Sequence, residues 1–493
     1  MDEKQEAFQR VCKFYNDGQY QLALDKLREF AAVYADELDR GNIRDIYQAK
    51  AVCLHGLGDV MGAIASIEQA IAHDVYLYQQ QMDYSSYLFF SHYIDGLSDQ
   101  ALRDRHLLFN RFFEGVQQYS HQPQKKQKLR IGYISPDFRE HIMAYFLIQL
   151  LACHDGQRYE VICYDLSGEK DDPITVQMKG LVEGWRDISR QVPELAAKTI
   201  HDDKVDILMD LAAHTGNGQG LRILAHKPAP VQLSGIGYMS TTGLKAVDYF
   251  LTDIYCDPPG QQDEDFIENL IRLPHSHFCY TPSECVLSCK QEYVLHMPVV
   301  FGSFNNFNKI TDRMLGLWLQ IVQQVPGSRL LLKNPKINQF HKEREVQRRA
   351  RKIGFTAEQL EIRSWSREYL PEYMDMDIAL DTFPYTGGGT TCEALYMGVP
   401  VITLTGTRHG TRFGYSLLEN IGIGELAAAN EAEYVKKAVS LAEDKELLIA
   451  LHRNLQGMMK ASPVMDGAGY TREVEAAYET IWRKWLMGNK KGR

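Results

Sequence analysis

The chain has 493 residues, of which 45% are hydrophobic and 24% charged, and its net charge is −10. This acidic balance argues against a nucleic-acid partner, which needs a basic face to neutralise phosphates. No stretch approaches the roughly 18 consecutive apolar residues of a membrane span. The polar start MDEKQEAFQR lacks the basic and apolar regions of a signal peptide. We therefore expect a soluble, cytoplasmic protein of several domains, whose oligomeric state the sequence leaves open.

Helical segments dominate residues 1–122. Two of them align with each other: Gly18 matches Gly58, and Ala23 matches Ala63. In each, a glycine turn opens a helix that carries a small residue where a neighbouring helix packs, a pattern typical of tetratricopeptide (TPR)-type helix pairs. In a third helical stretch, Leu97-Ser98-Asp99 is predicted to turn and cap a helix that begins near Gln100. We interpret this region as a docking platform for a protein or peptide, without chemistry of its own.

From residue 129 on, short apolar runs alternate with helical periods. The strand-like runs form two series: LRIGYIS, YEVICYDLS, VDILMDLAAH, VQLSGIGYM and DYFLTD, then VVFGSF, RLLLKNP, LEIRSW, DIALDTF and VPVITL. Such alternation predicts an α/β protein with two doubly wound, Rossmann-like domains, which we place at residues 123–285 and 286–493. Ligands of these folds bind at the carboxyl ends of the strands, so we expect the two domains to face each other across a cleft.

The cysteines indicate no metal site. All nine are scattered without a CxxC pair, which is untypical of a disulfide framework or a structural zinc site. The most closely spaced group, Cys279, Cys285 and Cys289, fits no common set of metal ligands. We therefore expect mostly buried cysteines and no bound metal.

Residues 381–395, DTFPYTGGGTTCEAL, place three glycines between a predicted strand and a predicted helix. The free N–H groups and the dipole of a helix start attract phosphate, and glycines let the phosphate approach the backbone closely. An isolated glycine triplet is more often a flexible loop, but this one lies on the ligand edge of the sheet. We therefore predict that Gly388, Gly389 and the helix start bind phosphate.

Two charged residues near this turn each have two interpretations. Glu393 either completes a capping box, with Thr390 as the N-cap, or accepts hydrogen bonds from ribose hydroxyls. Lys309 ends a polar run, residues 305–309, that follows the strand VVFGSF on the same edge. It is either an ordinary solvated lysine or the cation that neutralises a diphosphate.

Two histidines follow strands of the first series, His141 after LRIGYIS and His214 after VDILMDLAAH. Both are therefore expected at the ligand edge of the N-terminal sheet, where either could act as a base near neutral pH. Asp375-Met376-Asp377 matches the D-x-D signature of metal-dependent glycosyl transfer, but it precedes the strand DIALDTF, at the opposite edge. We therefore reject it as a metal site.

Five motifs carry a family resemblance: GYISPDFREH, KPAPVQLSGIGYMSTTGLKAVDYFLTD, GSFNNFNKI, DIALDTFPYTGGGTTCEALYMGVPVITL and ASPVMDGAGYTREVEAAYETIW. With them, the chain from about residue 85 to 490 resembles the bacterial O-linked N-acetylglucosamine transferase-like proteins, relatives of the eukaryotic enzyme and of the SPINDLY fucosyltransferases. The resemblance implies the GT-B fold, helical repeats in front, and a final helix that returns to the first domain. It also implies an inverting, metal-independent glycosyltransferase with a nucleotide-sugar substrate and no cofactor.

The resemblance further implies roles for single residues. Lys309 would hold the donor diphosphate, with Asn306 as a polar donor beside it. Glu393 would bind the ribose, and Tyr369, in the motif SWSREYLPEY with Ser366, would stack on the base. The remaining implied residues are the phosphate-binding Thr390 and Thr391 and the cleft histidine His141.

The sugar and the acceptor stay open. Met239-Ser240 stands where relatives usually have Pro-Gly, and Gly389 stands where the eukaryotic enzyme has a histidine. We favour transfer of N-acetylglucosamine from UDP-N-acetylglucosamine to a serine or threonine hydroxyl of a protein or peptide. The alternatives are a UDP-glucose or GDP-fucose enzyme, with asparagine as a possible acceptor, a sugar-nucleotide epimerase, and a non-catalytic adaptor that senses nucleotide sugar.

Overall fold

The computed structural model describes residues 3–261, 263–288, 293–333 and 340–488. Cys289 and the side chain of Cys285 lie outside the described residues, so the cysteine group considered above is only partly seen. In these ranges, no helix combines the length and the apolar character that crossing a membrane requires.

The N-terminal region consists of packed helices: α1 (Glu3–Asn16), α2 (Tyr20–Val33), α3 (Arg40–Leu57), α4 (Val60–His73), α5 (Leu77–Ser91) and α6 (Asp99–Leu107). Gly18 and Gly58 adopt positive φ in the turns before α2 and α4. Ala23 and Ala63 are fully buried and cluster with Cys53 and Ala51 of α3, respectively. Ser98 caps α6 by accepting a hydrogen bond from the Ala101 N–H. The predicted helix-pair pattern is therefore confirmed.

The first sheet is parallel throughout and has the strand order β3-β2-β1-β4-β5-β6-β7. Its strands are β1 (Leu129–Ser135), β2 (Tyr159–Asp165), β3 (Gly184–Asp187), β4 (Ile207–Asp210), β5 (Val231–Gly235), β6 (Tyr249–Asp253) and β7 (Asn269–Leu273). The accompanying helices are α7 (Ala144–Cys153), α8 (Pro173–Lys179), α9 (Pro193–Asp202), α10 (Gln219–Leu224) and α11 (Glu284–Ser288). The sequence did not predict β3 and β7, because these edge strands are only partly buried and lack a continuous apolar run.

The second sheet is also parallel, in the order β10-β9-β8-β11-β12-β13. Its strands are β8 (Val300–Ser303), β9 (Arg329–Lys333), β10 (Leu360–Arg363), β11 (Ile378–Leu380), β12 (Val401–Leu404) and β13 (Ala427–Ala428). The helices are α12 (Asp312–Gln324), α13 (Phe340–Ile353), α14 (Gly389–Tyr396), α15 (Phe413–Ile421), α16 (Glu431–Glu443) and α17 (Lys445–Lys460). Two doubly wound sheets behind a helical region confirm the predicted fold class.

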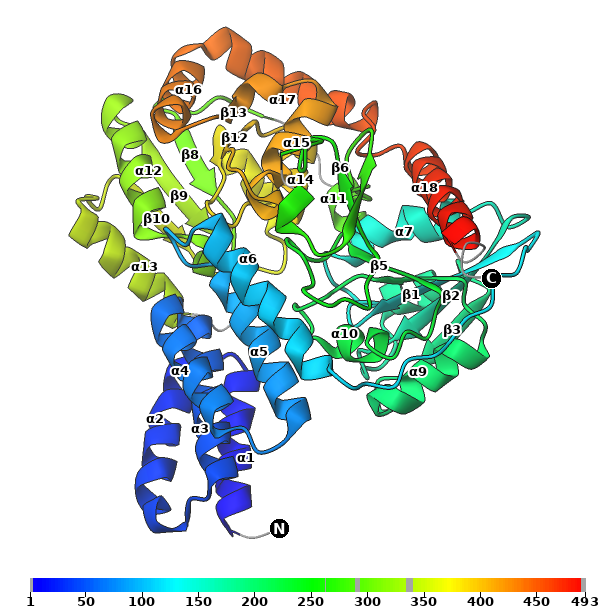
Figure 1. The fold of residues 1–493 in the computed structure, drawn as a ribbon. Helices are drawn as coiled ribbons and strands as arrows, with labels where there is room; N and C mark the ends of the chain where they lie inside the picture. The colour runs from blue at the N-terminus through cyan, green and yellow to red at the C-terminus, as the bar shows by residue number, and fades with distance from the viewer. Residues whose placement is uncertain (1–2, 262, 289–292, 334–339, 489–493) are drawn as a thin grey trace.

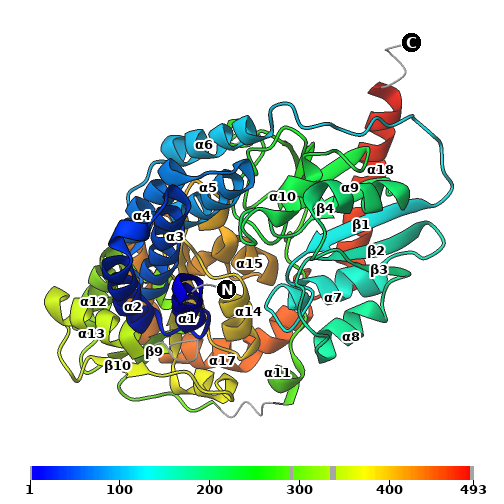
Figure 2. The same ribbon diagram turned by 90° about the horizontal axis from the view of Figure 1, so that it is seen from below.

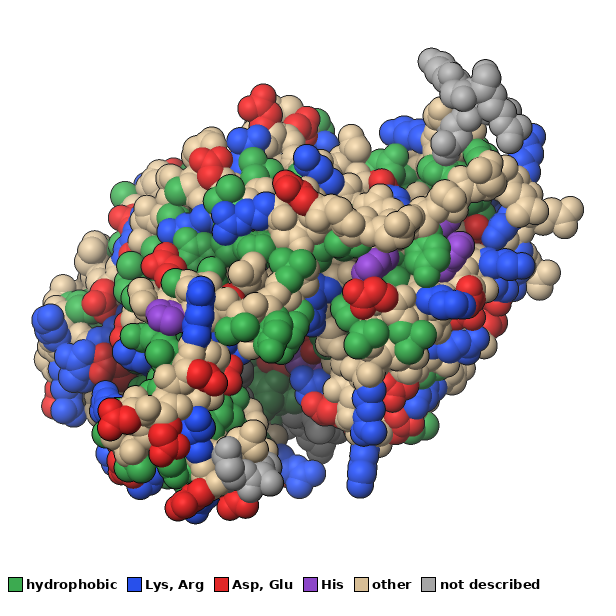
Figure 3. Space-filling view, turned by 60° about the horizontal axis from the view of Figure 1, so that its bottom comes forward, with side chains coloured by type: hydrophobic (Ala, Val, Ile, Leu, Met, Phe, Trp, Pro, Cys, Tyr) green, Lys and Arg blue, Asp and Glu red, His purple; other side chains and the backbone are tan. Residues whose placement is uncertain are grey.

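The last helix, α18 (Gly467–Gly488), crosses back and packs on α7 of the first domain (Figures 1 and 2). The Glu475 carboxylate lies 3.0 Å from His154 Nδ1, and the Tyr478 hydroxyl lies 3.0 Å from that of Tyr133 in β1. These contacts tie the end of the chain to the first sheet. On the face shown in Figure 3, acidic and basic side chains of the described residues are interspersed, without one continuous basic patch.

Candidate active site

The glycine turn joins β11 to α14 at the carboxyl edge of the second sheet. α14 begins at Gly389, and its N-cap is Gly388, which has no side chain to bond the first-turn N–H groups. These N–H groups have no partners inside the helix, and the helix dipole adds positive potential at the same point. The structure therefore presents the bare helix start that binds anions in other proteins.

Asp381 fixes the shape of this turn. Its buried carboxylate accepts hydrogen bonds from the N–H groups of Gly387 and Thr382 at 2.8 Å each, and from the Thr403 hydroxyl at 2.8 Å. Burial raises the pKa of Asp381 to about 6. Our sequence reasoning missed this residue, although a carboxylate directly before a glycine turn was a usable signal.

Lys309 ends a short 3-10 helix, Phe307–Lys309, after β8 and reaches the glycine turn. Its Nζ donates to the Thr386 carbonyl at 3.0 Å and lies 3.9 Å from the centre of the Tyr385 ring. Burial lowers the pKa of Lys309 to about 8, against the opposing effect of Asp381. The structure thus brings the lysine and the helix start together, as the sequence predicted from their shared sheet edge.

The polar residues around this lysine form two separate sets of hydrogen bonds, one with the threonine pair and one around Asn306. Thr390 donates its hydroxyl hydrogen to Asn305 Oδ1 at 2.9 Å, and buried Thr391 donates to the Gly387 carbonyl at 3.1 Å. Asn306 is partly exposed and accepts from the Asn308 N–H at 3.1 Å. Asn305, which we did not single out, is therefore the asparagine that contacts the threonine pair.

Glu393 is not part of a capping box. α14 starts one residue before Thr390, so Glu393 lies too far along the helix, and its carboxylate turns to two tyrosines instead. Tyr369 donates to it at 2.6 Å and Tyr373 at 3.1 Å. Burial raises the pKa of Glu393, and the two hydroxyls oppose that rise. The ribose-binding interpretation remains, with Tyr369 beside Glu393 as the predicted base contact requires.

Ser366 lies in a different network. It donates to Glu372 at 2.5 Å and accepts from the buried Lys333 at 2.8 Å, at the carboxyl end of β9. Lys333 also donates to Glu372 at 2.7 Å. The Ser366 hydroxyl is therefore committed to the Lys333–Glu372 ion pair.

The two candidate bases of the first domain have contrasting surroundings. His141 follows β1, its side chain is 38% exposed, and its Nδ1 lies 3.6 Å from Asp137 Oδ1. His214 is only 1% exposed, and burial lowers its pKa well below the usual range. Its Nε2 donates to the Thr242 carbonyl at 2.9 Å, so its Nδ1 accepts from the Ser85 hydroxyl of α5 at 2.5 Å. Both ring nitrogens of His214 are therefore engaged, Nε2 within the first domain and Nδ1 with the helical region, and this arrangement favours His141 over His214 as the base.

The two domains touch directly at the glycine turn. A Cβ built on Gly389 would overlap the side chain of Ile142, and one on Gly388 would lie 3.7 Å from the Phe278 ring. Ile142 is the neighbour of His141, so this contact brings the candidate base to the start of α14. Only a glycine fits at residue 389 while Ile142 keeps this position.

Two other groups of possible metal ligands are engaged with protein partners. Asp253, Cys256 and His277 form a fully buried cluster, in which Asp253 Oδ2 lies 2.5 Å from His277 Nδ1 and accepts from Ser416 of α15 at 2.8 Å. This cluster links the two domains through Ser416. In the rejected D-x-D motif, Asp377 precedes β11 at its amino end and accepts from Tyr293 at 2.7 Å and from the Val300 N–H at 2.7 Å.

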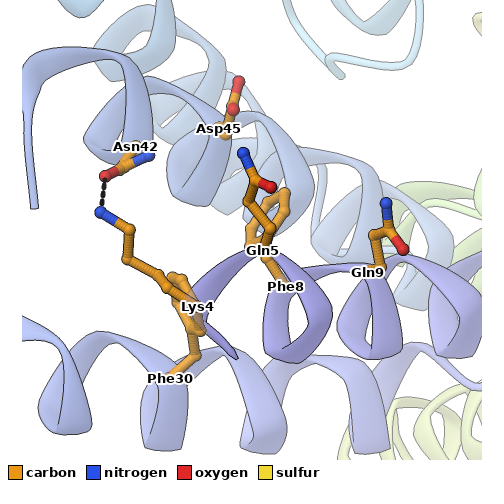
Figure 4. A pocket seen from close by; sticks show the side chains of 7 residues that line it. All are labelled: Lys4, Gln5, Phe8, Gln9, Phe30, Asn42 and Asp45. Carbon is orange, nitrogen blue, oxygen red and sulfur yellow. Dashed lines mark hydrogen bonds between the residues drawn. The ribbon is translucent and has the colours of Figure 1, made fainter. Parts of the chain in front are cut away.

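A separate pocket of about 370 Å³ opens among the first helices (Figure 4). Its walls combine two phenylalanine rings with polar side chains: Lys4, Gln5, Phe8, Gln9, Phe30, Asn42 and Asp45. Lys4 donates to Asn42 at 3.0 Å across it. The pocket therefore offers apolar surface and hydrogen-bonding groups on the helical region, remote from α14 (Figure 1).

Comparison with known proteins places this arrangement in a family. The chain is 40% identical over 411 residues to the probable UDP-N-acetylglucosamine–peptide N-acetylglucosaminyltransferase SPINDLY of Oryza sativa subsp. japonica, covering 80% of this chain and 44% of that protein. It is 30% identical over 377 residues to the corresponding probable enzyme SEC of Arabidopsis thaliana, covering 74% of this chain and 38% of the relative. The chain thus spans less than half the length of these curated relatives.

A solved structure shares the whole architecture. An O-GlcNAc transferase mutant from Thermobaculum terrenum is 29% identical and superposes with a TM-score of 0.90, over 99% of this chain and 92% of that one. The family model for glycosyl transferase family 41 matches residues 107–281 and 279–474, which include both sheets and the glycine turn. The chain therefore belongs to glycosyl transferase family 41.

Proposed function

We propose that the protein is an inverting glycosyltransferase that moves N-acetylglucosamine from UDP-N-acetylglucosamine to a serine or threonine hydroxyl of a protein or peptide. The proposal rests mainly on one observation: Lys309 lies beside the uncapped start of α14, at the carboxyl edge of the second sheet. The names of the relatives support the donor and the peptide acceptor.

In the proposed reaction the acceptor oxygen attacks the anomeric carbon while the bond from that carbon to the diphosphate oxygen breaks. Negative charge then grows on the leaving UDP. The ammonium of Lys309 and the first-turn N–H groups of α14 would stabilise that charge, and this kind of stabilisation is often the largest single contribution to catalysis. These groups would supply the positive charge from the chain itself, so activity should survive a chelator.

Binding of the nucleoside would use Glu393, in the middle of α14. The Glu393 carboxylate can exchange a tyrosine hydroxyl for a ribose hydroxyl, and the Tyr369 ring beside it offers a flat face for the base. The proton of the acceptor hydroxyl would pass to His141, whose neighbour Ile142 touches Gly389. His141 is thus the histidine of this edge that combines solvent access with proximity to the helix start.

Acceptor docking is proposed for the helical region. The pocket between α1, α2 and α3 has apolar walls for a side chain and amide groups for a peptide backbone (Figure 4). Substituting Phe8 or Phe30 should therefore raise the KM for a protein acceptor and leave UDP binding unchanged.

Calorimetric titration with UDP, GDP and UDP-N-acetylglucosamine tests the donor directly. We expect UDP-selective binding that weakens in Lys309→Met and largely persists in Lys309→Arg, which keeps the charge. Turnover on peptide acceptors should fall at least about a hundredfold in Lys309→Met. GDP-selective binding would move the assignment to a fucosyltransferase, and the absence of any nucleotide binding would contradict the proposed function.

A further inference from the structure

The aromatic ring of Tyr93, in the helical region, reaches the donor side of the candidate site. Tyr93 lies two residues after the end of α5 and is 6% exposed. Its ring centre lies 5.0 Å from that of Tyr385, with the planes at 60°, which is an edge-on arrangement of favourable geometry. Tyr385 belongs to the turn between β11 and α14. A residue of the repeats therefore packs on the turn that carries the glycines.

Tyr385 is also the ring that Lys309 covers. Lys309 Nζ lies 3.9 Å from its centre, within the range of a cation–π interaction. The backbone of Tyr385 is held by the Thr382 hydroxyl, which donates to its carbonyl at 2.8 Å. The orientation of the ring then depends on its packing, with Tyr93 as one neighbour and the lysine as another.

Tyr93 is itself held by other rings of the repeats. His55 of α3 meets it edge-on at 4.8 Å and stacks on Phe90 at 4.2 Å. His55 Nδ1 also lies 3.5 Å from the side-chain nitrogen of Asn308, the residue before Lys309. The helical region therefore contacts the Lys309 segment through His55 of α3, and it contacts the glycine turn through Tyr93 after α5.

We propose that Tyr93 is a positioning residue of the donor site: its ring holds Tyr385 against Lys309 and so fixes the ammonium beside the start of α14. This inference rests on the proposed function and adds a role for the helical region in it. Without the Tyr93 ring, Tyr385 gains room to rotate, and Lys309 loses the fixed ring beside it while it keeps its hydrogen bond to the Thr386 carbonyl. The charge beside the leaving diphosphate is then less well placed, and misplacement of a charged group weakens its effect steeply.

The test compares Tyr93→Ala with Tyr93→Phe in two backgrounds, wild type and Lys309→Met. UDP affinity measured by calorimetry should fall about five- to tenfold in Tyr93→Ala and stay within twofold in Tyr93→Phe, which keeps the ring. In the Lys309→Met background, Tyr93→Ala should have no further effect, because its influence passes through the lysine. Equal losses in both backgrounds would show a merely structural role and overturn the proposal, as would failure of Tyr93→Phe to bind normally.

A ligand-free readout separates this inference from the proposed function. Labelling of Lys309 by acetic anhydride, followed by mass spectrometry, should be several times faster in Tyr93→Ala than in wild type or Tyr93→Phe. Asp95→Ala is the matched control, since it removes a different contact of the helical region with the second domain, the 3.4 Å ion pair to Arg313. If wild type bound no nucleotide, the function would fail, while the labelling rates would still decide the inference; unchanged labelling would overturn it.

Discussion

The carboxyl edges of the two sheets face each other but are built differently. On the second sheet, Asp381 holds the glycine turn through backbone N–H groups, and Lys309 is fixed between a carbonyl and a ring. On the first sheet, His141 stands at the surface with Asp137 3.6 Å away. The proposed donor edge is therefore shaped before ligand arrives, whereas the proposed acceptor edge depends on how the first domain meets the second.

The largest effect that sharpens this comparison is expected from His141 and His214, the two candidate bases of the first domain. His141→Ala should lower kcat about a hundredfold or more, because a general base is lost, with the KM for the donor nearly unchanged. His214→Ala should instead lower the free energy of unfolding by about 1–3 kcal/mol, since Ser85 and Thr242 lose a buried partner. Kinetics and thermal unfolding of both variants provide the check, and full activity of His141→Ala would remove it as the base.

A smaller effect is expected where the two edges touch. The added Cβ of Gly389→Ala would overlap Ile142 and push the domains apart, so kcat should fall about ten- to a hundredfold. The double variant Gly389→Ala/Ile142→Ala should recover most of that loss, because the second change reopens the space. Wild-type turnover in the single variant, or a further loss in the double variant, would show that the Gly389–Ile142 contact does not determine how closely the two domains approach each other.

The smallest expected effect is the pH dependence of UDP affinity, which involves the donor edge alone. Because burial places the pKa of Lys309 near 8, the lysine is protonated at pH 7 and loses its proton as the pH rises through that value. Bound diphosphate favours the charged form, so UDP affinity should be full below about pH 7 and fall by up to about tenfold by pH 9. Titrations at several pH values check this, and Lys309→Arg should remove the pH dependence, as arginine stays charged.

The positions of Lys309 and the glycine turn at the donor edge could be predicted from short stretches of sequence. Lys309 and the glycine turn each follow a buried strand within a few residues, and parallel strands bring their carboxyl ends to one edge. The shared edge of parallel strands also predicted the position of His214, but it could not predict that His214 is buried. That depends on α5, which is more than a hundred residues away in the chain and covers the ring through Ser85.

The sequence by itself determined the two parallel sheets, the helical repeats and the glycine turn, because these follow from periodicity and from glycines within a few residues of each other. Only the tertiary structure decided that Glu393 binds two tyrosines, that Ile142 fills the space above Gly389 and that Tyr93 packs on Tyr385. Each of these contacts joins residues distant in the chain, and their side chains meet only once the domains and the helical region have packed together.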